Sequence, residues 1–210
     1  NDMAMRDHSL DDKITIAAFN EFFQKGYRVA SLRKIAEAAG VTVGAIQIRY
    51  KSKDDLFVSL LKPLLEDIKV VFDNTKADYF VETDADILAK LKESMKNESA
   101  AIIRLIFDHY EQAVLLLCRS TGSSLEQYFD AVVQSKIKES IAFFREADQH
   151  LIDEKLLGFL IFAQFDGYRR IVNECQNREI AEKYMDALMT YHLGGWTALF
   201  SVNDKKSQEV

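Results

Sequence analysis

The sequence predicts an all-α protein of about nine helices, with a small three-helix domain at its N-terminal end and a larger helical domain after it. Three observations predict this fold class. The 210 residues include only eight glycines and one proline, although sheets joined by tight turns need these two residues at the turns. Apolar residues recur at helical spacing along most of the chain, and boxes of the form Ser/Thr-x-x-acid stand where helices would begin.

A first helix is expected from the Ser-x-x-Asp box at residues 9–12 to Gly26. The side chains of such a box accept hydrogen bonds from the N–H groups that a helix start leaves without partners. Ile14, Ala17 and Phe22 then recur at helical spacing. A glycine at the end of such a pattern terminates the helix, because it adopts the left-handed conformation without strain.

Two short helices joined by a tight turn are expected next. Ser31 can cap a helix over about 32–39, and Thr42 can cap another that reaches about Arg49. Gly40 separates the two helices.

The spacing within this pair indicates a helix-turn-helix. Ala36, Gly40 and Ile46 stand four and then six residues apart. This spacing provides a small residue where two helices cross, a glycine in the turn, and an apolar residue that packs back onto the first helix. The polar positions between them are expected to point outward.

A basic island lies on an otherwise acidic chain. The net charge of the whole sequence is −6, but within residues 24–53 the basic side chains face a single acidic one, Glu37. Such an island predicts a local contact with a polyanion. Its members are Lys25, Arg28, Arg33, Lys34, Arg49, Lys51 and Lys53.

The rest of the chain is expected to form amphipathic or buried helices. A box at residues 52–55 opens a long helix, and Pro63 is expected to kink it because proline cannot donate to the carbonyl of Ser59. Further helices are expected to begin at 83–86, to span 98–119, to run from the box at 123–126 to about 147, and to span about 153–176 and 179–201. The predicted domains are therefore 9–55 and 56–201, followed by a polar tail, 202–210.

Motifs for catalysis, metal binding and membrane insertion are missing from the sequence. Cys118 and Cys175 lack the paired spacing of a zinc or redox motif, and the four histidines are scattered. Nucleophile elbows and glycine-rich nucleotide-binding loops do not occur. We therefore expect no catalytic residue, no metal site and no cofactor. Apolar runs stay shorter than the ~18 residues of a membrane-spanning helix, so a cytoplasmic protein without membrane contact is expected.

A combination of residues between 13 and 61 carries a resemblance to a known family. These residues are Ile14, Ala17, Ala18, Phe22, Lys25, Gly26, Tyr27, Ser31, Ile35, Ala36, Ala38, Ala39, Gly40, Val41, Thr42, Gly44, Tyr50, Lys51, Ser52, Lys53 and Leu56. In this combination the segment resembles the DNA-binding domain of TetR-family transcriptional regulators. The resemblance implies that the remaining residues form an effector-binding and dimerisation domain.

The resemblance makes the third helix a recognition helix that enters the major groove of operator DNA. The candidate base readers are Val43, Ala45, Gln47, Ile48 and Arg49. Gln47 can bind adenine and Arg49 can bind guanine through paired hydrogen bonds, whereas Ile48 can touch a thymine methyl group, as can Ala45. The candidate phosphate contacts, which set position rather than sequence, are Ser31, Arg33, Thr42 and Lys53. The alternative is that these residues are solvated helix faces and ordinary caps.

One position departs from the family pattern. The family usually has a tyrosine where this chain has Gln47, and that aromatic ring holds the DNA backbone or packs beside it. The departure changes the expected phosphate contacts and leaves the DNA-binding interpretation in place. Tyr50 retains the aromatic residue expected in the core.

A homodimer through the two C-terminal helices is also implied by the resemblance. Independently, these helices are more apolar than one buried face requires, and they contain glycines at a cost of ~1 kcal/mol each. Close approach of a partner helix would explain the glycines, and an intramolecular contact or a helix end at the last two are the alternatives. The four glycines are Gly158, Gly167, Gly194 and Gly195.

The resemblance further implies a small-molecule effector bound among the middle helices, between about residues 60 and 170. The candidate ligand-binding residues are Phe72, Phe107, Tyr110, Phe129, Phe162, Phe165 and Asp166. Asp166 could meet a cationic ligand, pair with Arg169 or Arg170, or face solvent. Repression is expected rather than activation, because the resemblance implies that the protein occludes a promoter.

Two other classes of function remain open from the sequence. One is an all-helical enzyme that acts on a hydrophobic substrate. The other is a helical protein-interaction module whose helix-turn-helix packs against protein. Salt dependence separates the second from a DNA-binding regulator, because phosphate contacts release counterions and an apolar interface does not.

Overall fold

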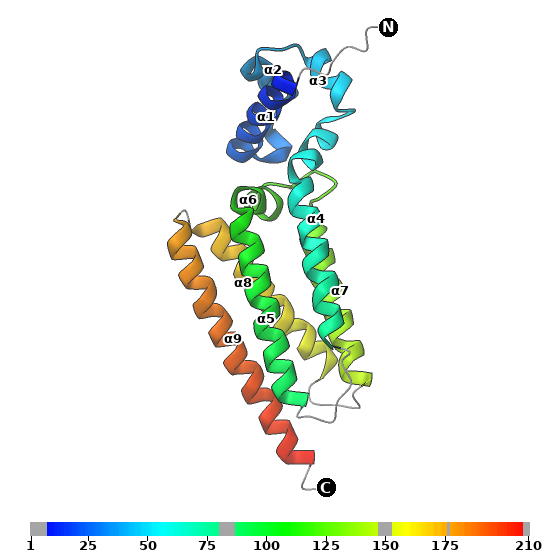
Figure 1. Cartoon of the computed structure of the whole chain (residues 1–210), viewed down its shortest axis with the longest axis vertical. Helices are drawn as coiled ribbons and strands as arrows, with labels where there is room; N and C mark the ends of the chain where they lie inside the picture. The colour runs from blue at the N-terminus through cyan, green and yellow to red at the C-terminus, as the bar shows by residue number, and fades with distance from the viewer. Residues whose placement is uncertain (1–7, 80–86, 147–152, 176, 208–210) are drawn as a thin grey trace. The chain divides into compact units, whose positions relative to one another are not determined.

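The computed structural model describes residues 8–79, 87–146, 153–175 and 177–207, and over these residues it consists of nine helices without a strand (Figure 1). This confirms the predicted all-α fold. The helices are α1 (His8–Val29), α2 (Leu32–Ala39), α3 (Val43–Arg49), α4 (Lys53–Tyr79), α5 (Ile87–Asp108), α6 (Tyr110–Cys118), α7 (Tyr128–Glu146), α8 (Glu154–Glu174) and α9 (Arg178–Ser207). Among the described residues, none of these helices is both long and apolar enough to span a membrane.

The chain divides into two compact units. The first unit comprises Asn1–Pro63 and Glu111–Tyr128, and the second comprises Leu64–Tyr110 and Phe129–Val210. Helix α4 contributes to both, and the division falls directly after Pro63, which lies inside a continuous helix. The predicted domain ranges and the predicted kink at this proline stay predictions.

The first unit is built around apolar side chains from α1 to α4. Ile14, Phe22, Ile35, Ile46 and Phe57 are fully buried. The rings of Phe22 and Phe57 meet edge to face with their centroids 5.0 Å apart, a favoured arrangement for aromatic pairs. Apolar positions at helical spacing thus converge on one core, as the sequence pattern predicts.

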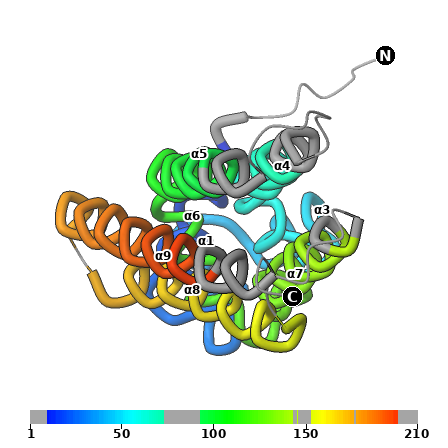
Figure 2. Tube along the Cα trace, turned by 90° about the horizontal axis from the view of Figure 1, so that it is seen from below, coloured from blue at the N-terminus to red at the C-terminus, as the bar shows by residue number. Residues whose placement is uncertain are grey.

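The second unit is a bundle in which α9 packs against α5 and α8 (Figure 2). Leu157, Ile161 and Val172 of α8 are buried in it, as are Met185 and Trp196 of α9. Polar side chains are buried in the same interior, among them Glu98, Lys136 and Gln164.

Helix boundaries differ from the predictions at three places. The helix predicted over 98–119 is divided at His109 into α5 and α6. The prediction missed this break because the apolar pattern continues through the turn. The box at 123–126 forms a turn before α7 instead of its first turn, since Ser123 Oγ accepts from the backbone N–H of Leu125 and Gly122 has φ 90°. Helix α9 extends to Ser207, into the predicted tail, and the start predicted at 83–86 lies outside the described residues.

Candidate nucleic-acid interface

Helices α2 and α3 form the predicted helix-turn-helix, and their caps are the predicted residues. Ser31 Oγ accepts from the backbone N–H of Arg33 at 3.2 Å, and Thr42 Oγ1 accepts from that of Ala45 at 3.1 Å. Gly40 ends α2 with φ 69°, a left-handed conformation that favours glycine. In the first helix Gly26 has φ 72°, so regular α-helix stops there as predicted, and a short helical stretch beyond this kink reaches Val29.

The two helices are fixed by burial of the residues that the spacing singled out. Ala36 is 3% exposed and Ile46 is fully buried. The backbone N–H of Val41 donates to the carbonyl of Ala36 at 2.9 Å, which closes the turn between α2 and α3. The orientation of α3 is therefore set by apolar packing beneath it and by a hydrogen-bonded turn before it.

The outer side of α3 differs from residue to residue. Ile48 is 84% exposed, and Gln47 is exposed beside it. Val43, Ala45 and Arg49 are half-buried. Covering the exposed apolar surface of Ile48 would be favourable, because it removes this surface from water. The side chain therefore offers an apolar contact to a binding partner.

Arg49 is tied to α1. Its Nε donates to the carboxylate of Asp11, and one of its terminal nitrogens donates to the carbonyl of Ala45 at 3.3 Å. The Arg49 side chain is 17% exposed and that of Asp11 is 27% exposed. The predicted guanine contact of Arg49 stays a prediction. Residue spacing does not indicate this ion pair, because Asp11 already belongs to a capping box.

Lys53 is similarly engaged within the first unit. Its Nζ donates to the carbonyls of Tyr27 at 2.8 Å and Ala30 at 3.0 Å, and it lies 4.4 Å from the centre of the Tyr27 ring. These contacts fasten the end of α1 to the start of α4. Arg33, in contrast, is exposed in the first turn of α2. The predicted phosphate contacts of both residues stay predictions.

The segment that follows α6 packs onto α1 and α4 within the first unit, which sequence reasoning missed. The backbone N–H of Tyr27 donates to the carbonyl of Arg119 at 2.8 Å, and that of Ser124 donates to Asp54 Oδ1 at 2.9 Å. Burial, with a smaller effect of the neighbouring Asp54 carboxylate, raises the pKa of Tyr27. The run of small polar residues at 120–124 was the available signal, since such residues form turns.

The candidate effector-binding residues are distributed between the core and the surface of the second unit. Phe107 and Phe165 are buried, and Phe162 is 38% exposed. The half-buried candidates are Phe72, Tyr110 and Phe129. The structure brings Phe107 and Tyr110 together, with their rings stacked 5.6 Å apart.

Asp166 pairs with two arginines, which is one of the alternatives that the sequence left open. It accepts hydrogen bonds from Arg169 and from Arg170, the latter at 3.0 Å. The hydrogen bond from Arg169, and to a smaller extent that from Arg170, lowers the pKa of the Asp166 carboxyl. The guanidinium of Arg169 also lies 5.6 Å from the centre of the Phe129 ring.

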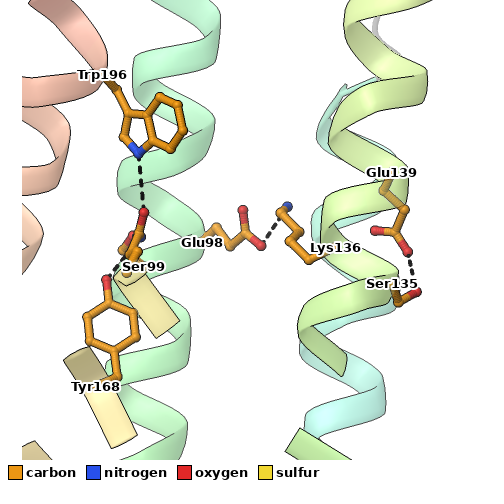
Figure 3. A network of polar contacts seen from close by, with 8 residues as sticks. Glu98, Ser99, Ser135, Lys136, Glu139, Tyr168 and Trp196 are labelled. Carbon is orange, nitrogen blue, oxygen red and sulfur yellow. Dashed lines mark hydrogen bonds and ion pairs between the residues drawn. The ribbon is translucent and has the colours of Figure 1, made fainter. Parts of the chain in front are cut away.

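Buried polar side chains from three helices of the second unit are joined by hydrogen bonds (Figure 3). The indole N–H of Trp196 on α9 donates to Gln164 Oε1 on α8 at 3.2 Å. The amide nitrogen of Gln164 donates to Tyr168 Oη at 3.2 Å and to Ser99 Oγ on α5 at 3.4 Å. We call these four residues the Gln164 network.

A buried ion pair lies in the same unit. Lys136 Nζ on α7 lies 2.6 Å from Glu98 Oε1 on α5, and each side chain is only 8% exposed (Figure 3). Sequence reasoning missed this pair and the Gln164 network. The available signal was a charged residue at a position where helical periodicity predicts an apolar one. A single residue of this kind does not indicate its partner on another helix.

Helix α9 presents a stripe of exposed apolar and small residues, which we call the α9 seam. The members alternate in spacing between four and three residues, and they are Ile180, Tyr184, Ala187, Tyr191, Gly194 and Ala198. Tyr191 is 74% exposed and Tyr184 is 52% exposed. On α8, Leu156 and Phe159 are also exposed, at 43% and 62%.

The four glycines of α8 and α9 fall into two classes. A Cβ added to Gly167 would lie 2.6 Å from Leu188 of α9, so this glycine permits close contact within the chain. A Cβ on Gly158 would make an ordinary contact with Ile137 at 3.6 Å. A Cβ on Gly194 or Gly195 would meet nothing within 4 Å, and both lie inside α9 rather than at its end.

Comparison with known proteins agrees with this geometry. Residues 14–60 match the family described as bacterial regulatory proteins, tetR family. The fold is similar to that of a TetR-like transcriptional regulator from Rhodococcus sp. RHA1, with a TM-score of 0.56 and 14% identity over 89% of this chain and 96% of that chain.

Two further solved structures are similar. NalD, the secondary repressor of the MexAB-OprM multidrug efflux pump in Pseudomonas aeruginosa, has a TM-score of 0.53 and 20% identity over 87% of this chain and 95% of its own. The regulator FadR from Bacillus subtilis, in complex with stearoyl-CoA, has a TM-score of 0.50 and 17% identity over 85% of this chain and 97% of its own.

The family match covers the segment in which α2 and α3 form the helix-turn-helix, and the structural similarity extends over most of the remaining helices. The family is one of DNA-binding regulators and not of enzymes, which decides against the enzyme alternative. Residues 14–60 therefore belong to the tetR family of bacterial regulatory proteins, and the fold of the described chain is similar to that of TetR-like transcriptional regulators.

Proposed function

We propose that this regulator is a repressor that binds a palindromic operator as a homodimer and releases it when a small-molecule effector binds. The observation that carries the DNA-binding part is the outer side of α3, where Gln47 and Ile48 are exposed on a helix whose orientation is fixed from beneath. An α-helix of this kind fits the major groove, in which each base pair presents a distinct pattern of groups.

Gln47 and Ile48 are the side chains that we expect to read bases. The amide of Gln47 can pair with adenine, and the exposed face of Ile48 can cover a thymine methyl group. Val43 and Ala45, at the edge of the same surface, add smaller apolar contacts. The backbone N–H groups at the start of α2, together with Ser31, Arg33 and Thr42, are expected to bind phosphates.

Fluorescence anisotropy on DNA from upstream of the protein's own gene, against a scrambled duplex, tests this proposal. We expect selective binding that weakens steeply with salt, because phosphate contacts release counterions. Gln47→Ala should reduce selectivity by about 1–3 kcal/mol, the range for one paired base contact. Gln134→Ala, at an exposed position of α7, is the matched control. Equal binding of the upstream and scrambled duplexes, together with a selection from random duplexes that enriches no sequence, would contradict the proposal.

The α9 seam supports the homodimer. Apolar residues that alternate at spacings of four and three are the pattern by which two helices pack along a shared line. The stripe is exposed in the single chain, and Gly194 within it leaves room for a partner backbone to approach. A two-fold dimer also presents two recognition helices to the two halves of a palindrome.

Sedimentation equilibrium tests the dimer. We expect the full chain to sediment as a dimer and Tyr191→Glu to sediment as a monomer, because a carboxylate in an apolar seam is costly to bury. Thr190→Glu, at the exposed neighbouring position, should remain a dimer. A wild-type monomer, or equal behaviour of the two variants, would contradict this interface.

The Gln164 network and the Glu98–Lys136 pair support an effector site in the second unit. Polar groups in an otherwise apolar interior are the usual means by which a pocket orients a ligand, and the buried rings of Phe107 and Phe165 supply apolar surface. FadR from Bacillus subtilis takes stearoyl-CoA, which makes this compound a reasonable first probe.

Trp196 provides the readout for effector binding. It is the only tryptophan in the sequence, it is 4% exposed, and its indole N–H donates to Gln164. We expect an effector that enters the network to change tryptophan emission at the same concentrations that release operator DNA. An effector that releases DNA without changing emission would place the site elsewhere.

The operator is released if the effector binds only an arrangement of the two units in which the recognition helices of the dimer do not fit adjacent major grooves. DNA affinity then falls by the difference in effector affinity between the arrangements. We assign the coupling to Pro63, after which the two units divide. If Pro63→Ala leaves both DNA affinity and effector response unchanged, this assignment is wrong.

A further inference from the structure

The ion pair between Asp11 and Arg49 joins the first turn of α1 to the last residue of the recognition helix. Both side chains are largely shielded, at 27% and 17% exposure. The second contact of Arg49, to the carbonyl of Ala45, holds the guanidinium along its own helix. The positive charge of Arg49 is thus both neutralised and kept at the edge of the exposed face.

An arginine released at this position would act differently. Helix α3 has seven residues, so it is about 10 Å long, and both of its ends lie close to the phosphate backbone when it occupies a major groove. A mobile guanidinium there would bind phosphates of any sequence, and such contacts supply most of the affinity for non-specific DNA.

We propose that Asp11 is a specificity-determining residue, which keeps Arg49 from contacting the phosphates of non-operator DNA. This inference rests on the proposed operator binding, and it assigns Arg49 to restraint rather than to guanine recognition. The ion pair persists in the operator complex, where Gln47 and Ile48 contact the bases. Discrimination then improves because Asp11 weakens binding to the many wrong sequences, not because it adds a contact to the right one.

Asp12 provides the matched control. It carries the same charge one residue further along α1 and is exposed, so Asp12→Ala changes the net charge of the domain as Asp11→Ala does. Both variants are measured by anisotropy on a scrambled duplex and on a duplex selected by the wild-type protein, across a salt series. Both are repeated in an Arg49→Ala background, and urea unfolding of each variant reports any change in folding stability.

Asp11→Ala should bind the scrambled duplex more tightly than Asp12→Ala does. One added phosphate contact per protomer makes two per dimer, which steepens the salt slope by about 1.8 and corresponds to roughly sixtyfold in affinity at 0.1 M salt relative to 1 M. The ratio of selected to scrambled affinity should fall, whereas an equal gain on both duplexes would show that Asp11 limits affinity without determining specificity. In the Arg49→Ala background the two alanine variants should behave alike, because the effect of Asp11 passes through Arg49.

Three further outcomes would overturn the inference. Equal salt slopes for Asp11→Ala and Asp12→Ala would show that Arg49 is not withheld by Asp11. An effect of Asp11→Ala that survives in the Arg49→Ala background would show that it does not act through Arg49. If the wild-type protein binds no duplex at low salt, the proposed operator binding fails as well, which separates that failure from the first two.

Discussion

The interiors of the two units are filled differently. In the described part of α1 to α3, the buried side chains are apolar, and Ile14, Ile35 and Ile46 are fully buried. The second unit buries the Glu98–Lys136 pair and Gln164 among its apolar residues. Among the described residues, the first unit thus buries one polar side chain, Ser120, and no charged one, whereas the second unit buries two charged side chains.

This difference indicates which buried residues serve stability and which serve function. Apolar burial stabilises a fold by about 25 cal/mol per Å², whereas a buried ion pair gains little over well-packed apolar residues because both charges lose their hydration. A recognition helix needs a fixed orientation, which apolar packing supplies. We therefore tie the buried pair of the second unit to the proposed effector site rather than to stability.

The largest expected effect comes from breaking the buried pair. Lys136→Met should lower the free energy of unfolding by about 3–5 kcal/mol, because it leaves the Glu98 carboxylate in a site built for a charged partner. The double variant Glu98→Leu with Lys136→Met should regain most or all of this loss. Urea unfolding followed by circular dichroism measures both.

The same double variant sharpens the comparison between the units. If the pair serves an effector, the double variant should fold and bind operator DNA but no longer respond to the effector. A double variant that remains as unstable as Lys136→Met would mean that the pair is required for folding, and the contrast between the two interiors would lose its functional meaning.

A somewhat smaller effect is expected in the apolar interior of the first unit. Ile46→Ala should lower the free energy of unfolding by about 2–5 kcal/mol, since it opens a cavity beneath α3, and DNA affinity should fall with it. Ile48→Ala, two residues along and 84% exposed, should leave stability within about 0.5 kcal/mol and reduce only DNA binding. Loss of stability in both variants would show that Ile48 also serves packing.

Much of the first unit could be predicted because its signals are local. Ser31, Gly40 and Thr42 act on their immediate neighbours in the chain, so the caps and the turn follow from the sequence. The partner of Arg49 could not be found in this way, because Asp11 is 38 residues away and already had an explanation as part of a capping box.

The second unit shows the limit of sequence periodicity more clearly. Apolar spacing predicted both ends of α8 to within two residues. It predicted α5 and α6 as one helix, because the apolar pattern continues without a break at His109. It also gave one explanation to all four glycines. Only packing separates Gly167, which a neighbouring helix approaches, from Gly194, which faces open space in the single chain.

These two glycines give the next prediction. Gly167→Ala should lower the free energy of unfolding by about 1 kcal/mol, because overpacking against Leu188 costs about 1–3 kcal/mol and better helix propensity returns about 1 kcal/mol. This loss should not depend on protein concentration.

Gly194→Ala should instead weaken the dimer, so its destabilising effect on thermal unfolding should be largest at high protein concentration and should disappear as dilution dissociates the wild-type dimer. Thermal unfolding at several concentrations compares the two variants. If Gly194→Ala stabilises the protein by about 1 kcal/mol at every concentration, as expected for an exposed helical glycine, no partner helix approaches there.

The smallest expected effect concerns His192 of α9, whose pKa is lowered by burial. Burial favours the neutral imidazole in the folded state, so this contribution to stability is present above the ordinary pKa of 6.5 and is lost as the pH falls below it. The stability advantage of the wild type over His192→Gln, measured by urea unfolding at pH 7.5 and at pH 5.5, should therefore shrink at the lower pH. A constant advantage would mean that folding does not shift the pKa of His192. An advantage that grows towards acid would mean that the folded state favours the charged imidazole, and His192 would then join the polar groups inside the second unit instead of its apolar packing.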